Sequence, residues 1–182
     1  MGIPSDSSRI RGASAFVEAV GAEPDDEDVR FLTSVATGGD GDRARWELRY
    51  ARRALGLLAA QRDALNDRTG SAVAHEMARA LANDRHVAAG MVKVAERQFN
   101  DRLSSYRDVL SSRVSYEGTG VRLARTLLTL AGAAAPDEFA LTRAGDLLAR
   151  YLGEANEALR KSFGVATLPD SPSPSSLDRD SR

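Results

Sequence analysis

A histidine followed by a glutamate is the first feature of this sequence whose residue types and spacing could support metal chemistry. His75 and Glu76 begin the pattern of a helical zinc site, but the second ligand of that pattern, four residues after the first, is here Arg79. The other histidine, His86, would lie about 16 Å further along an unbroken helix, too far away to share one ion. We therefore predict no metal site.

Nucleophilic and carboxylate catalysis also lack a recognisable arrangement. Serines are plentiful, but neither histidine accompanies a pattern such as Gly-x-Ser-x-Gly, which exposes a nucleophile at a sharp turn. Glu154 and Glu157 share a helix face, yet the chain has no Glu-x-x-His pair of the kind that builds metal-bridged bundles. The sequence thus predicts no catalytic residue and no cofactor. An alternative is an enzyme or small-molecule binder that uses Arg62, His75 and Tyr106 as a buried polar site.

Four arginines close together in the sequence form a basic stripe, namely Arg45, Arg49, Arg52 and Arg53. The first three follow helical spacing, so their guanidinium groups could hold phosphates or a carboxylate-rich partner. Glu47 and the acidic turn 25–28 lie close by in the sequence, and salt bridges to these acids are the favoured interpretation. Binding of nucleic acid or another polyanion through the stripe is therefore the alternative rather than the main hypothesis.

Composition favours a helical protein without a dominant charge. Of the 182 residues, 42% are hydrophobic but only 5% are aromatic, so the core must consist mainly of alanine, leucine and valine. The net charge of -1 gives no general attraction to nucleic acid, and the absence of cysteine excludes disulfides and thiolate chemistry. No stretch supplies the roughly 20 apolar residues that span a bilayer. The N-terminus also lacks a secretory signal, and we expect a cytoplasmic protein that does not bind membranes.

Apolar residues recur at helical spacing along most of the chain, which predicts an all-α protein. Short helices are expected within 10–37, and main helices at about 42–66, 71–112, 117–135 and 136–163. The helix at 42–66 carries two apolar stripes and is expected to lie at the centre of the bundle. The helix at 71–112 is expected to be continuous or merely kinked, with Asn83-Asp84 and Gly90 as alternative break points.

The expected organisation is a single antiparallel helical bundle over residues 10–167 with extended ends. Residues 1–9 are predicted to be flexible, and the Pro/Ser-rich residues 168–182 are predicted to be disordered. Long apolar stripes without a catalytic arrangement are typical of interaction proteins. We therefore expect a non-catalytic interaction or scaffold module that self-associates through its long, coiled-coil-like helices, with a protein, itself or another, as its partner.

Overall fold

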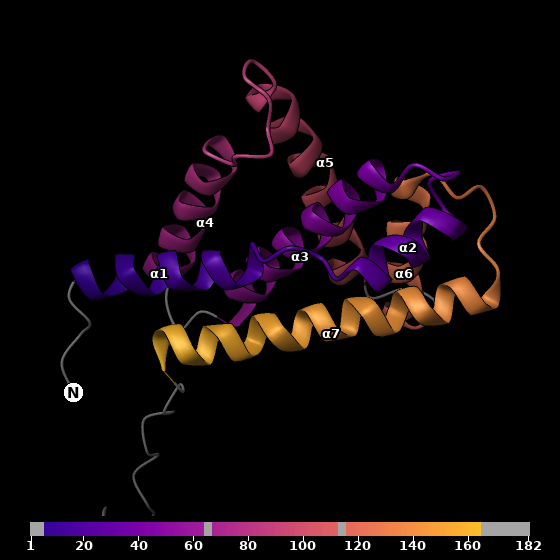
Figure 1. Ribbon diagram of the computed structural model, residues 1–182. Coiled ribbons are helices and arrows are strands. Elements are labelled where there is room, and N and C mark those ends of the chain that lie inside the picture. Colours follow the sequence, from indigo (N-terminus) through magenta and orange to yellow (C-terminus); the bar gives the residue numbers. More distant parts are fainter. Residues whose placement is uncertain (1–5, 64–66, 113–115, 165–182) are drawn as a thin grey trace, which may run out of the picture.

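Helices form every regular element that the structure describes. The computed structural model describes residues 6–63, 67–112 and 116–164, and within these ranges it contains α-helices but no strand. In chain order the helices are α1 (Asp6–Val20), α2 (Asp26–Val35), α3 (Gly41–Asp63), α4 (Asp67–Ala82), α5 (Val92–Ser111), α6 (Thr119–Ala131) and α7 (Glu138–Phe163). The predicted all-α class and helical bundle are confirmed (Figure 1).

Helix α3 is the centre of the fold and contacts all six other helices. Its alanines and leucines are buried on several faces, and Ala44, Leu48, Ala51 and Leu55 have no exposed surface. Small residues let the neighbouring helices approach closely. At Gly56, for example, an added Cβ atom would lie 2.9 Å from Cγ1 of Val20 on α1. The prediction that this helix buries two faces and lies centrally is therefore confirmed.

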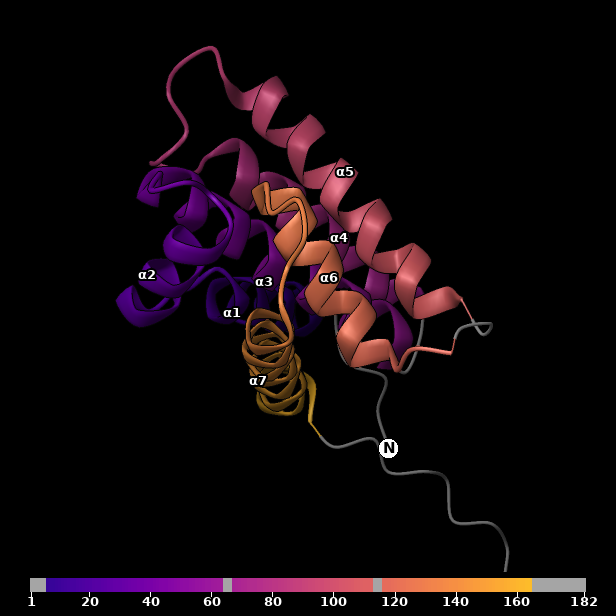
Figure 2. The same cartoon turned by 90° about the vertical axis from the view of Figure 1, so that its right-hand side faces the viewer.

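Helix α7 forms the base of the molecule, and α1 runs antiparallel beside it (Figure 1). Figure 2 looks along α7 and shows α3 and α6 on the same side of it. Helices α1 and α7 approach closely at Gly12, where an added Cβ atom would lie 2.7 Å from Cε1 of Phe163 and 2.8 Å from the carbonyl oxygen of Ser162. A side chain at this position would push the two helices apart.

Replacing Gly12 with alanine is expected to lower the free energy of unfolding by roughly 1–2 kcal/mol, because overpacking costs about 1–3 kcal/mol and higher helix propensity returns up to about 1 kcal/mol. Gly153 on α7 is the matched control, since an added Cβ atom there has no neighbour within 4 Å among the described residues. Gly153→Ala should raise the free energy of unfolding by about 0.5–1 kcal/mol. Urea unfolding measures both changes, and equal effects would rule out the close α1–α7 contact.

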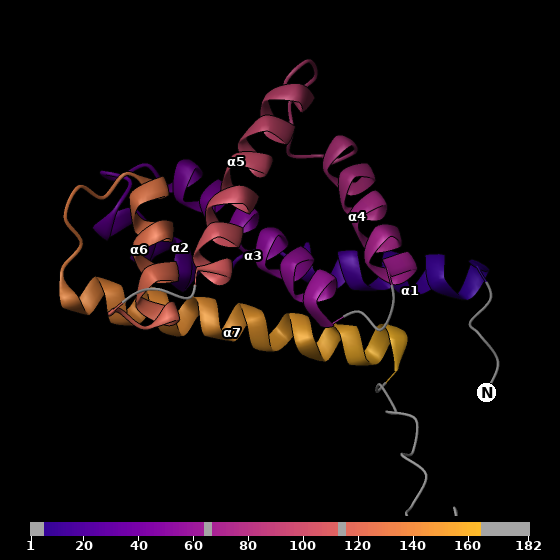
Figure 3. The ribbon, with the colours of Figure 1, turned by 180° about the vertical axis from the view of Figure 1, so that it is seen from behind.

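The prediction of one helix over 71–112 is wrong, because the chain turns sharply between α4 and α5. Asn83 donates from its side chain to the carbonyl oxygen of Arg79 at 2.7 Å, and Asp84 accepts from the backbone N–H of His86 at 2.9 Å. These side-chain hydrogen bonds compete with those of a continuing helix. Gly90 then adopts a left-handed conformation with φ of +83°, which glycine tolerates best. Figure 3 shows α4 and α5 diverging from this turn as a hairpin.

The other predicted boundaries agree with the structure to within a few residues, except at the N-terminus. Residues 1–9 were predicted to be flexible, but Asp6–Arg9 form the first turn of α1, where Arg9 is buried against the rest of the helix bundle. Helix α7 begins just after Pro136, as predicted, with Asp137 accepting from the backbone N–H of Ala140 at 2.7 Å. The predicted disordered tail at 168–182 lies outside the described residues.

Candidate functional site

All four arginines of the predicted basic stripe lie on α3, and each holds a carboxylate of the same chain. The N–O distances are 3.3 Å for Arg45–Asp26, 2.6 Å for Arg49–Glu23, 2.7 Å for Arg52–Glu154 and 2.6 Å for Arg53–Asp84. Arg49 and Arg53 are buried, with exposed fractions of 5% and 9%. The stripe therefore joins α3 to the α1–α2 connection, α2, α7 and the α4–α5 turn. The salt bridges are internal, as the favoured interpretation held, but of the acids it named only Asp26 in the turn 25–28 pairs with the stripe, whereas Glu47 pairs with Arg102.

The predicted buried polar site of Arg62, His75 and Tyr106 is wrong, because two of its members are exposed. Arg62 follows the buried part of α3 and pairs with the neighbouring Asp63. His75 lies on the outer face of α4. Val73 and Met77 face the core, and a residue two positions from each of them lies on a different face of the helix. Only Tyr106 is buried, and this burial raises the pKa of its hydroxyl.

The charged groups that act on Tyr106 are instead a partly buried ion pair between Glu47 on α3 and Arg102 on α5. Arg102 donates to Glu47 through two nitrogens, with an Nε–Oε2 distance of 3.1 Å, and the Glu47 side chain is only 5% exposed. Such a forked pair is geometrically specific and joins the two helices. Because 55 residues separate the partners, helical spacing gives no signal for this contact.

Two adjoining hollows open on the surface where α3 faces the α4–α5 turn, and they share Trp46 and His86. The apolar recess has a volume of about 230 Å³, and its walls include Trp46, Tyr50, Val87, Met91, Val94 and Ala95. The charged recess has a volume of about 430 Å³ and is lined by Glu23, Asp42, Arg45, Trp46, Arg49 and His86. Together they form one surface in which an apolar hollow is flanked by charges of both signs.

The aromatic wall of the apolar recess is held in place from three sides. The rings of Trp46 and Tyr50 lie 5.4 Å apart, and the guanidinium carbon of Arg49 lies 4.9 Å from the Trp46 ring. The Tyr50 hydroxyl donates to Oε1 of Gln98 on α5 at 3.0 Å, and burial raises the pKa of this hydroxyl. The indole ring therefore packs between the Arg49 guanidinium and the Tyr50 ring, and Gln98 in turn holds the Tyr50 hydroxyl.

The opposite wall comes from the α4–α5 turn, which one ion pair and one histidine–carboxylate contact hold against the bundle. Asp84 is 4% exposed and receives the guanidinium of Arg53 at 2.6 Å. Burial alone would raise the pKa of Asp84, but hydrogen bonds from the backbone of His86 and from Arg53 lower it below the ordinary value. His86 lies beside Glu23, with an Nε2–Oε1 distance of 3.3 Å. The recess therefore exists because the turn is tied to α3 and to the α1–α2 connection.

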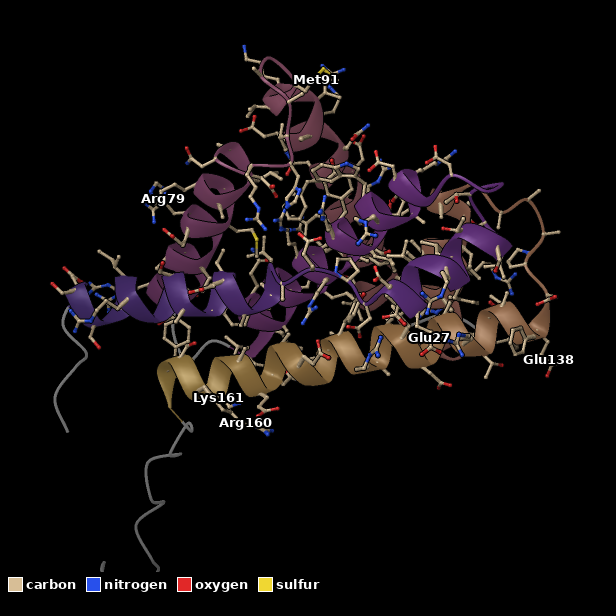
Figure 4. The ribbon with its side chains drawn as sticks, viewed as in Figure 1. Glu27, Arg79, Met91, Glu138, Arg160 and Lys161 are labelled. Atoms are coloured by element: carbon tan, nitrogen blue, oxygen red, sulfur yellow. The ribbon has the colours of Figure 1, made fainter. Side chains whose placement is uncertain are left out.

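Apolar side chains are exposed at the rim of this recess. Met91 is 48% exposed and Val94 is 41% exposed, although both line the hollow. Figure 4 shows Met91 at the apex of the hairpin, far from the end of α7 marked by Glu138. Trp46, Met91 and Val94 were not predicted as site residues, because their positions were assigned to the middle of long helices. The possible break points at Asn83-Asp84 and Gly90 were the sequence signal that could have indicated the turn between α4 and α5.

A third buried tyrosine, Tyr151 on α7, differs from Tyr50 in the hydrogen bonding of its hydroxyl. Its hydroxyl is buried and has no hydrogen-bond partner among the described residues, whereas that of Tyr50 donates to Gln98. Tyr151→Phe is expected to raise the free energy of unfolding by about 1 kcal/mol, while Tyr50→Phe should lower it by about 1 kcal/mol. Thermal and urea unfolding of both variants test this. A larger loss for Tyr151→Phe than for Tyr50→Phe would contradict the assignment.

The two recesses are surface features of the residues that the structure describes. In residues 6–63, 67–112 and 116–164, no three His, Asp or Glu side chains are placed to hold a metal ion. None of the helices there combines the length and apolar character needed to cross a membrane. The two recesses can receive an apolar side chain with charged groups beside it.

The chain matches no protein-family model, no curated protein and no solved structure.

Proposed function

We propose that this protein is a non-catalytic protein-interaction module that associates with a second copy of itself. The observation that carries the proposal is the exposure of Met91 and Val94 beside a recess that Trp46 also lines. Exposed apolar groups gathered around a hollow are typical of protein-binding surfaces, whereas single exposed apolar residues are common everywhere. Association would remove these side chains from water and fill the recess.

The surface that we propose differs from the one predicted from the sequence. Self-association was expected along the long amphipathic helices, but the apolar faces of α3 and α7 are buried against other helices of the same chain. Buried faces cannot pair with a second molecule without unfolding the first. We therefore place the contact at the α4–α5 turn, where apolar side chains are exposed.

The two alternative functions gain no support from the arrangement of their proposed residues. Polyanion binding relied on the basic stripe, whose four guanidinium groups already hold carboxylates. A bundle enzyme relied on a site containing Arg62 and His75, both of which are exposed. The cytoplasmic location stays a prediction.

Sedimentation velocity of the full chain at rising concentration tests the proposal. Because the exposed surface is small, we expect a reversible dimer with a dissociation constant on the order of 10 µM. The average mass should rise from that of the 19.5 kDa chain towards twice that value. A strict monomer at several hundred micromolar, on the order of 30 times that constant, would contradict self-association.

A further inference from the structure

The imidazole ring of His86 lies where the α4–α5 turn meets the rest of the molecule, and one of its nitrogens faces two groups. Nε of Arg85 donates to Nε2 of His86 at 3.2 Å, and Oε1 of Glu23 lies 3.3 Å from the same nitrogen. A guanidinium donor needs a lone pair on Nε2, whereas a carboxylate acceptor needs a proton on it. One nitrogen cannot meet both demands at once, so the two contacts belong to different states of the ring.

The two contacts differ in the segments that they join. Arg85 is the neighbour of His86 in the turn, whereas Glu23 belongs to the α1–α2 connection on the body of the molecule. A proton taken up from solvent makes both ring nitrogens donors, so the ring no longer accepts from Arg85. The ring also gains a charge opposite to that of Glu23. Protonation therefore exchanges a contact within the turn for one that ties the turn to the bundle.

Glu23 is already positioned and ionised for this contact. Arg49 holds one of its carboxylate oxygens, Oε2, with Nε at 3.1 Å and Nη2 at 2.6 Å, while the other oxygen faces His86. Burial alone would raise the pKa of Glu23, but the hydrogen bond and the charge of Arg49 lower it below the ordinary value of 4.5. Glu23 therefore stays ionised between about pH 5 and about pH 8, the range in which histidine changes its charge.

The other charged groups around the ring are mostly paired with each other. Besides Glu23 and Arg85, they come from α3 and from the turn, and they are Asp42, Arg45, Arg49, Arg53 and Asp84. The three arginines of α3 in this set each hold a carboxylate. The residues of α5 that line the apolar recess with His86 carry no charge. The state of the ring is therefore decided by its direct contact with Glu23, to which the charge of Asp42 adds and which that of the exposed Arg85 opposes.

We propose that His86 is a pH-sensitive latch, which binds Glu23 and holds the α4–α5 turn to the α1–α2 connection when protonated, and accepts from Arg85 and releases Glu23 when neutral. Attachment of the turn is then strongest below the pH range in which histidine titrates, and it weakens as the pH rises through that range. Because His86 lines both recesses, the latch sets how firmly one wall of each is held. The inference concerns a single chain and is independent of the proposed self-association.

Amide hydrogen exchange of the full chain, dilute enough to be monomeric, tests the latch at about pH 5.5 and about pH 8. The reporters are the backbone N–H groups of His86 and Val87, which both donate to Asp84 at 2.9 Å and exchange when the turn opens. Protection factors, which remove the intrinsic pH dependence of exchange, should be about 3-fold higher at the lower pH, as expected for a partly exposed ion pair. Equal protection at both pH values, or higher protection at the higher pH, would overturn the proposal.

Two histidine variants separate the protonation of His86 from its packing. His86→Gln keeps a side chain that donates and accepts but cannot gain a charge, so the ratio of protection factors at the two pH values should fall to about 1. His75→Gln removes the only other histidine of the chain, on the outer face of α4, and should keep the ratio of the wild type. A ratio that persists in His86→Gln, or that disappears in His75→Gln, would show that another group controls the turn.

Arg85→Ala distinguishes an exchange of partners from a simple ion pair. Without Arg85, the neutral ring is free to carry its proton on Nε2 and to donate to Glu23 at the higher pH as well, so protection there should rise towards its value at the lower pH. Unchanged or lower protection in Arg85→Ala at the higher pH would contradict the exchange.

Two acid variants identify the partner of the protonated ring. Glu23→Gln keeps an oxygen for Arg49 but removes the charge that attracts His86, so the pH dependence of protection should disappear. Asp42→Asn alters another acid of the charged recess and should keep most of that dependence. Circular dichroism should show the same helicity for both variants. A pH dependence that survives Glu23→Gln, or that is lost in Asp42→Asn, would overturn the assignment of Glu23 as the partner.

Discussion

Replacing Glu47 with leucine is expected to lower the free energy of unfolding by about 3–5 kcal/mol, because it leaves the partly buried guanidinium of Arg102 without its carboxylate. The loss should exceed that of Glu157→Gln, which breaks the exposed Lys161–Glu157 pair and should cost little because solvent screens that pair. Urea denaturation followed by circular dichroism measures the free energy of unfolding of both variants. A loss below 1 kcal/mol for Glu47→Leu would show that the pair between α3 and α5 contributes little.

The double variant Glu47→Leu/Arg102→Met separates the ion pair from the packing around it. Apolar residues of similar size often replace a buried pair without loss, because neither charge then has to be removed from water. We therefore expect the double variant to recover most of the stability lost by Glu47→Leu. The coupling energy from the four-protein cycle should be several kcal/mol, on the order of 3. Additive losses would contradict a direct interaction.

Replacing Asp84 with alanine is expected to lower the free energy of unfolding by roughly 3 kcal/mol, because Arg53 loses its buried partner. It also removes the acceptor of the His86 N–H group, so the turn should detach from α3. Amide hydrogen exchange in 83–91 should accelerate, and Trp46 should become more exposed. Asp101→Ala, an exposed acid on α5, is the control and should change stability by less than about 0.5 kcal/mol.

The contribution of Asp84 to the free energy of unfolding should also decrease as the pH falls. Its pKa in the folded state is lowered from the ordinary value of 3.8, so the carboxylate stabilises the fold above that value. As the pH falls through the lower folded-state pKa, this stabilisation disappears. Asp84→Asn keeps a side-chain oxygen for the turn but loses the charge, so its deficit at pH 7 should shrink below pH 3.8. A deficit independent of pH would contradict a role for the charge.

Helix positions could be predicted from the sequence because apolar periodicity directly reflects the buried faces. The central helix α3 shows this most clearly, since Ala44, Leu48, Ala51 and Leu55 repeat at four and three residues and are all fully buried. Pro136 and Gly164 likewise marked the start and end of α7. These signals are local, and local signals suffice to define a helix.

The break between α4 and α5 could not be predicted with equal success, because the apolar pattern continues through it. Met77, Leu81 and Ala95 are buried as in one long amphipathic helix, whereas Met91 is exposed. What ends α4 is a competition between backbone and side-chain hydrogen bonds at Asn83 and Asp84, stabilised by Arg53 from another helix. Tertiary contacts of this kind override the periodic pattern.

The candidate site depends on pairs that are distant in the sequence, and residue spacing says nothing about such pairs. His86 meets Glu23, and Trp46 faces Val94 only because the turn folds back on α3. The arginines of α3 were correctly placed on a helix. Their partners, apart from the acidic turn that includes Asp26, come from segments that the sequence did not connect to them. A recess formed by three segments therefore becomes visible only in the folded chain.

Disulfide trapping tests the proposed self-association at the α4–α5 turn most directly, because the natural chain has no cysteine and Met91→Cys introduces a single one. A disulfide needs Cα atoms about 4.4–6.8 Å apart, a condition that two copies of one residue meet only when both lie beside the two-fold axis of a symmetric dimer. Under mild oxidation, Met91→Cys should form a covalent dimer rapidly, while Phe139→Cys should remain mostly monomeric. Equal rates for the two variants, or faster trapping through Phe139→Cys, would contradict pairing at the α4–α5 turn.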